Sequence, residues 1–162
     1  MRKTLLLLLA TSSCATTSAW RYDALGAANE QFDCARLIYA DPKSASPLRF
    51  EISRIGYEIG AYLNLVQYRL SGDSAVLVTL KYGDEIYKEE VPLLEGKMRL
   101  RLSSEMTSRL VMALQEGKRV KIGTDGFEET LQSESFAPLY QKLEKNGQFL
   151  QNILKGPSEW IN

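Results

Sequence analysis

The sequence predicts a mainly β protein, an antiparallel β-sandwich-like domain with two short helices. Apolar and polar residues alternate along several short segments, glycine-containing turns separate them, and two later stretches repeat apolar residues with helical spacing. A chain of 162 residues provides about one domain. We divide it into a signal peptide at 1–13, a tether with room for a short helix at 14–33, a β-rich domain at 34–147 and a C-terminal tail at 148–162.

The first 14 residues have the layout of a secretory signal peptide. Arg2 and Lys3 give a positive start, an apolar run at 5–10 follows, and small polar residues lead to Cys14. The apolar run is much shorter than the roughly 18 residues needed to span a bilayer as a helix. No later segment is long and apolar enough either, so an integral membrane protein is not expected.

This stretch resembles a bacterial lipoprotein signal, in which a small residue precedes a cysteine that receives the lipid and becomes the new N-terminus. Ser13 before Cys14 fits the resemblance, which implies lipidation of Cys14 and an outer-membrane lipoprotein facing the periplasm. Cleavage after Ala15 or Ala19 would instead give a soluble periplasmic or secreted protein, and an uncut cytosolic chain is a third alternative. The second cysteine, Cys34, is expected to be a small buried residue.

Composition narrows the classes of function. The chain has 20 basic and 20 acidic residues, and loss of 1–13 leaves 18 basic residues, so nucleic acid is not an expected partner. Histidine is absent, which removes the commonest general base and the commonest metal ligand. No nucleophile-elbow serine or phosphate-binding glycine loop occurs. We therefore expect no cofactor, no metal site and no catalytic residue.

The predicted strands follow one another along the middle of the chain. After a first strand at 34–39 and a proline-containing loop at 41–47, Leu48, Phe50 and Ile52 alternate with polar residues, as in a half-buried strand. Turn residues separate four further strands, at 61–70, 75–82, 85–94 and 97–103. These spacings indicate an antiparallel meander.

The pair Glu95-Gly96 predicts a two-residue hairpin turn. In that register Val91 faces Leu100. Because Pro92 cannot donate a ladder hydrogen bond, its strand is expected at a sheet edge or with a bulge. Such a bulge would turn Glu89 out to water.

Two helices and a second hairpin complete the domain. Ser103 or Ser104 can cap a helix at 105–116, and Ser133 or Ser135 can open another that ends near 146–147. The pair Asp125-Gly126 predicts a turn between strands at 118–124 and 127–132. The acidic residues after this turn lack the ligand spacing of a calcium loop.

Six basic residues form the candidate binding surface. If the two strands that carry them are neighbours, the sheet presents a cationic face to an anionic lipid, an acidic glycan or an acidic partner. The alternative is a solvated face neutralised by Glu90 and nearby acids. The six residues are Lys97, Arg99, Arg101, Lys118, Arg119 and Lys121.

The segment from Met98 to Lys145 has the order strand, helix, Asp-Gly hairpin and closing helix, with the sequences LxxALxxGKRVKI and SFAPLYQKLEK. It resembles the C-terminal half of the invasion-associated locus B group of exported bacterial proteins, which are β-sandwich domains. Phe136, Leu139 and Leu143 would hold the matching positions of the closing helix. These are packing residues, so the resemblance implies a fold and no activity.

Location and composition together favour a non-enzymatic binding or accessory role in the cell envelope. The expected partners are another envelope protein and, through a lipid anchor, the membrane. The alternative is a module that binds an anionic lipid or glycan through the basic strand face, and an enzyme of unknown type is third. Trp20 and Trp160 are expected either to pack together or to contribute to a partner site. The sequence leaves the oligomeric state open.

Overall fold

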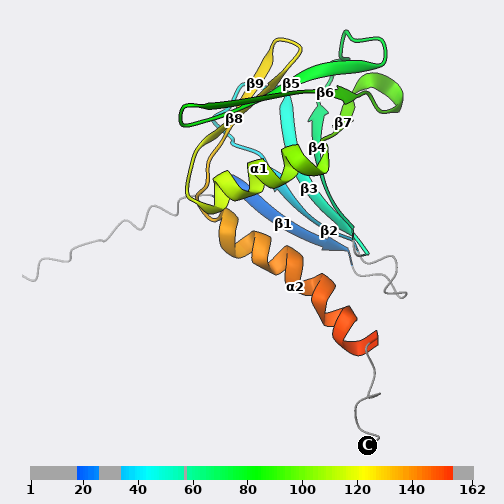
Figure 1. Cartoon of the computed structure of the whole chain (residues 1–162), viewed down its shortest axis with the longest axis vertical. Coiled ribbons are helices and arrows are strands. Elements are labelled where there is room, and N and C mark those ends of the chain that lie inside the picture. The colour runs from blue at the N-terminus through cyan, green and yellow to red at the C-terminus, as the bar shows by residue number, and fades with distance from the viewer. Residues whose placement is uncertain (1–17, 26–33, 57, 155–162) are drawn as a thin grey trace, which may run out of the picture.

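The computed structural model describes residues 18–25, 34–56 and 58–154. They form two antiparallel sheets and two helices, which confirms the predicted β-sandwich-like fold (Figure 1). The five-stranded sheet contains, in spatial order, β1 (Trp20–Leu25), β2 (Cys34–Tyr39), β3 (Leu48–Ile55), β4 (Glu58–Leu65) and β7 (Arg99–Arg101). The four-stranded sheet contains β6 (Glu85–Pro92), β5 (Ala75–Tyr82), β8 (Val120–Thr124) and β9 (Phe127–Leu131).

The core lies on one side of each sheet. Leu37, Phe50 and Leu63 point inward from the five-stranded sheet, and Leu80 and Ile122 point inward from the four-stranded sheet; all five are fully buried. The four-stranded sheet crosses the other near one end, where β9 contacts β3 (Figure 1). Helices α1 (Ser104–Gln115) and α2 (Phe136–Leu154) cover the rest, α1 against β4, β5 and β8, and α2 against β1, β2 and β3.

The prediction of a tether is wrong for residues 20–25, which form strand β1. All six residues pair in register with β2. Trp20 points into the core, where it is 3% exposed, while Arg21 and Asp23 point to the opposite face and form an ion pair of 3.1 Å. Trp20 lies in the core and Tyr22, two residues on, packs against it in part, contacts that a tether would not make. Residues 26–33 and Trp160 lie outside the described part of the chain.

The chain turns at Glu95-Gly96 as predicted, and Leu93 forms an antiparallel bridge with Leu100 across the turn, but the predicted register and the extended strand pairing are wrong. Strand β6 pairs with β5 and strand β7 pairs with β4, so the chain crosses from one sheet to the other here. A short 3-10 turn, η2 (Glu95–Lys97), makes the crossing, with Gly96 at a φ of 83°. Leu100 therefore lies between Leu63 of β4 and Leu93, and not opposite Val91.

Two smaller expectations about β6 have different outcomes. Pro92 lies in the edge strand of its sheet, as its missing N–H requires. Glu89 does not turn out to water: it is half-buried, and its carboxylate accepts a hydrogen bond of 2.7 Å from the Ser103 hydroxyl. Ser103 also caps α1 by accepting a hydrogen bond of 3.1 Å from the Met106 N–H, so Glu89 is connected to the start of that helix.

The second helix is longer than predicted. α2 continues to Leu154, past Gly147, where the sequence predicted its end. One glycine inside a helix costs about 1 kcal/mol relative to alanine, and the following residues keep an apolar spacing at 149, 150 and 153. The predicted tail at 148–162 is therefore helical as far as 154. No helix in the described ranges combines the length and the apolar character needed to cross a membrane.

The predicted turn at Asp125-Gly126 is confirmed. Its Asp125 side chain is hydrogen-bonded to Ser71, in the loop between β4 and β5. Asp125 and Gly126 both have positive φ angles, 51° and 80°, as this tight hairpin turn requires. The Asp125 carboxylate accepts hydrogen bonds from the Ser71 hydroxyl at 2.5 Å and the Ser71 N–H at 2.7 Å. The hydroxyl first, and then the N–H, lower the pKa of Asp125 below its usual value of 3.8.

We expect Ser71→Ala to raise the pKa of Asp125 toward 3.8, because it removes the larger of these two hydrogen bonds. Since the folded state lowers this pKa, the associated stability is present above about pH 3.8 and is lost as the pH falls through the folded-state value. Carbon-detected NMR titration of the Asp125 carboxyl would measure the change. An identical titration in the variant and the wild type would contradict the expectation.

Candidate functional site

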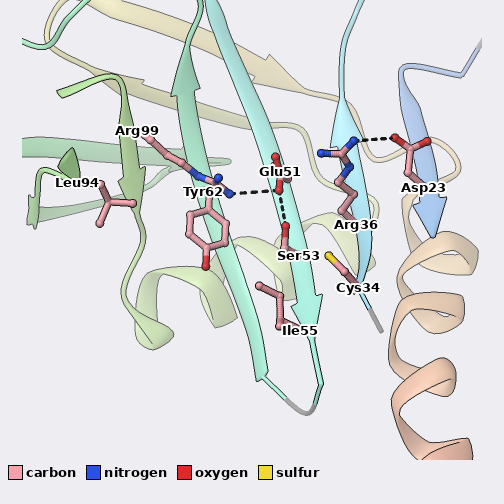
Figure 2. Close-up of a pocket in the computed structure, with 9 residues that line it drawn as sticks. All are labelled: Asp23, Cys34, Arg36, Glu51, Ser53, Ile55, Tyr62, Leu94 and Arg99. Atoms are coloured by element: carbon pink, nitrogen blue, oxygen red, sulfur yellow. Dashed lines mark hydrogen bonds and ion pairs between the residues drawn. The ribbon is translucent and has the colours of Figure 1, made fainter. Parts of the chain in front are cut away.

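The outer face of the five-stranded sheet carries a pocket with a volume of about 320 Å3, here called the outer-face pocket (Figure 2). No helix or strand of the described residues covers this face. Cys34, Ile55 and Leu94 lie at the margin of the pocket. Its charged and polar lining consists of Asp23, Arg36, Glu51, Ser53, Tyr62 and Arg99.

Strand register brings these side chains together. Along β2, Ala35 and Leu37 are buried, so Cys34 and Arg36 must point outward. Arg36 lies opposite Asp23 of β1 on one side and Ser53 of β3 on the other. In the next row, Glu51 of β3 lies opposite Tyr62 of β4. Residues that are far apart in the sequence therefore lie side by side in the lining of the pocket, because their strands are neighbours in the sheet.

Two arginine–carboxylate pairs dominate the electrostatics of the pocket. Arg99 lies 3.3 Å from Glu51, whose side chain is only 14% exposed, and Arg36 lies 3.5 Å from Asp23. The Arg99 guanidinium also stacks on the Tyr62 ring at 4.0 Å. The Ser53 hydroxyl donates a short hydrogen bond to Glu51. A shielded arginine pair of this kind fixes both side chains more firmly than an open surface pair does.

Both arginines keep an unused hydrogen-bond donor. The Nε atoms of Arg36 and Arg99 are buried and have no partner among the described residues. A buried donor without a partner costs about 1–3 kcal/mol. The shielded Nε atoms are out of a ligand's reach, but the side chains of Arg36 and Arg99 are 40% and 41% exposed. Their outer N–H groups can therefore donate to a carbonyl or carboxylate group in the pocket.

The six predicted basic residues do not form one surface. β7 and β8 belong to different sheets, so the condition for a shared cationic face is not met. Four of the six are paired with acids other than Glu90: Arg99 with Glu51, Arg101 with Glu58, Lys118 with Glu116 and Lys121 with Glu128. Lys97 lies in the crossing turn and Arg119 just before β8. Arg99 alone of the six lines the outer-face pocket.

Sequence reasoning missed Arg36, Glu51 and Tyr62 as site residues. Their outward orientation follows from alternation within each strand, which the sequence shows. Their proximity depends on which strands pair and in which register, which alternation does not determine. Cys14, the predicted lipidation site, lies outside the described residues, and Cys34 is half-buried.

The described residues include no cluster of three or more His, Cys, Asp or Glu side chains placed to hold a metal ion. No family model, no curated protein and no solved structure matches this chain. The geometry of the outer-face pocket is therefore the basis for its proposed function.

Proposed function

We propose that this chain is a non-enzymatic lipoprotein of the bacterial cell envelope that acts as a binding or accessory component for another envelope protein. The observation that carries the proposal is the outer-face pocket, whose lining includes two arginines, Arg36 and Arg99, with side chains that are 40% and 41% exposed. In the proposed complex, Arg36 and Arg99 donate hydrogen bonds, and carbonyl or carboxylate oxygens of a partner segment accept them.

A polypeptide partner fits the margin of the pocket as well as its centre. Ile55 is 56% exposed and Leu94 is 38% exposed, and they lie on different sides of the charged lining (Figure 2). Binding sites for proteins combine arginine and tyrosine with apolar contacts. A segment that covers Ile55 and Leu94 while it contacts Arg36 and Arg99 would use all of these groups.

The N-terminal segment supports the location. Cys14 precedes Trp20, the first residue of β1, by six positions. Six residues span at most about 20 Å. A lipid on Cys14 would therefore hold the domain close to the membrane surface, within reach of other proteins of the envelope.

Photo-cross-linking in cells tests the partner surface. We expect a cross-linking residue at Ile55 or Leu94 to give one protein adduct, because the partner covers both positions. The same residue at Met112, which is 59% exposed on α1, is expected to give none. Adducts with the same proteins at all three positions would indicate random collisions and contradict the proposal.

A pair of arginine variants sharpens this test. Arg99→Ala is expected to reduce the adduct at Leu94 about tenfold, since arginine is enriched among the few interface residues whose loss costs more than about 1 kcal/mol of binding free energy. Arg109→Ala is the matched control, because Arg109 also pairs with a glutamate, Glu105 at 2.9 Å, and lies over a tyrosine ring, Tyr87 at 4.6 Å. Equal losses for the two variants would argue against the pocket.

A further inference from the structure

The strands of the five-stranded sheet present arginine, and no lysine, on their outer face among the described residues. The five basic side chains of that face are Arg21, Arg36, Arg49, Arg99 and Arg101, and its acids are Asp23, Glu51 and Glu58. The adjoining turns add no net charge, because Asp41 is followed by Lys43 and Glu95 by Lys97. The described part of this face therefore has more positive than negative side chains.

The excess of positive charge lies toward one end of the strands. Arg49 of β3, Asn64 of β4 and Arg99 of β7 lie directly opposite one another, and we call these three residues the arginine row. Neighbouring strands are about 4.8 Å apart, so the backbone positions of Arg49 and Arg99 are about 10 Å apart. Arg101 follows Arg99 on the same face of β7, whereas Glu58 lies at the other end of β4, opposite Ile55.

Carboxylates of the described residues compensate these arginines unevenly. Glu51 compensates Arg99 at 3.3 Å and is itself only 14% exposed. Arg49 has no carboxylate partner among the described residues, and its Nη1 donates to the carbonyl oxygens of Ser46 at 3.0 Å and Leu48 at 3.1 Å. Arg101 lies 3.5 Å from Glu58, but both side chains are more than half exposed, and such a pair contributes little.

The residue type and the position of the acids favour a polypeptide as the ligand. A guanidinium group binds a carboxylate through two parallel hydrogen bonds, and arginine is enriched in protein interfaces. A segment one strand wide can follow the arginine row and stay clear of Asp23 and Glu58. A bilayer would cover the whole face and bring its phosphate groups to both acids. In an extended segment, alternate side chains point the same way and are about 7 Å apart, which suits arginines with these positions.

We infer that the partner segment bound on this face is acidic and extended, with carboxylates at alternate residues. One carboxylate binds Arg49, and the next binds the outer N–H groups of Arg99 together with Arg101. The Asn64 amide, between them, hydrogen-bonds the backbone of the segment. This inference rests on the proposed function, because the segment belongs to the protein partner of the outer-face pocket.

Fluorescence anisotropy with two labelled peptides tests the inference. One short peptide alternates glutamate with threonine, and the other has glutamine in place of each glutamate. At low salt the full chain is expected to bind the glutamate peptide at least about tenfold more tightly than the glutamine peptide. Arg49→Gln with Arg101→Gln is expected to weaken binding of the glutamate peptide about tenfold.

The matched control is Arg109→Gln with Arg119→Gln. It changes the net charge equally, but Arg109 lies on α1 and Arg119 just before β8, so binding within about twofold of the wild type is expected. Arg101→Gln alone guards against misfolding. Its side chain is 52% exposed, so an unchanged melting temperature and about threefold weaker binding are expected.

Equal affinities for the two peptides, or equal losses in the two double variants, would overturn the inference. So would tighter binding to phosphatidylglycerol vesicles than to the glutamate peptide, if Arg49→Gln with Arg101→Gln abolished it, because the ligand would then be a lipid. If the adducts at Ile55 and Leu94 form while the two peptides bind equally, the protein partner stands and its acidic character is excluded. A clear preference for the glutamate peptide with no adduct in cells would instead count against the envelope partner.

Discussion

Trp20→Ala is expected to lower the free energy of unfolding by about 3–5 kcal/mol, the usual loss for a large buried aromatic residue. The indole is 3% exposed, and its ring lies within 4.9–6.0 Å, centroid to centroid, of Tyr39, Phe50 and Phe136. Its Nε1 also donates a hydrogen bond of 2.6 Å to the Gln132 carbonyl oxygen. One side chain thus joins β1 to the inner side of the sheet and to the start of α2.

Urea denaturation would measure this loss. The variant Trp20→Phe separates the contribution of ring packing from that of the hydrogen bond to Gln132. Phenylalanine keeps an aromatic ring in the core but loses the hydrogen bond to Gln132, so a smaller destabilisation of about 1–3 kcal/mol is expected. If Trp20→Ala cost less than about 1 kcal/mol, β1 would not belong to the cooperative core, and the original expectation of a tether would regain support.

Two strands, β2 and β5, have the bounds that the sequence predicted. β5 matches its predicted range of 75–82, because its apolar alternation lies between Gly72-Asp73 and Gly83-Asp84. β1 was missed because only five of its residues, Trp20 to Ala24, alternate, and they lie beside a stretch rich in alanine. Its strand character comes from pairing with β2 and from burial of Trp20, which are tertiary effects.

Long-range pairing limited the prediction of the sites more than residue type did. Glu95-Gly96 has the same local signal for a hairpin as for a crossing between sheets. That ambiguity placed Arg99 beside the wrong strand, although its outward orientation was correct. Arg99 and Arg101 were recognised as surface cations, but their neighbour Arg49 follows only from the order β3-β4-β7.

Cys14→Ser is expected to abolish incorporation of labelled palmitate and to move the protein from the membrane fraction to the soluble fraction. Each buried methylene of an acyl chain contributes about 0.8 kcal/mol to membrane binding, and a stable anchor takes two signals. Lys81→Gln, as a control, should leave palmitate labelling unchanged.

The structure bears on one of the cleavage alternatives, the cut after Ala19, because that cut would alter β1. Cleavage after Ala19 would remove the Ala19 carbonyl oxygen that accepts from the Ala40 N–H at 2.9 Å, and the Ser18 hydroxyl that accepts from the Trp20 N–H at 3.2 Å. It would also place a charged α-amino group on Trp20, which is buried, and burying a charge is costly. These contacts count against cleavage after Ala19 alone. If Cys14 is lipidated as proposed, mass spectrometry of the processed N-terminus is expected to find a lipid-modified Cys14. An unmodified chain that begins at Thr16 would replace the anchor with simple secretion, and one that begins at Trp20 would contradict the role of Ala19 in the sheet.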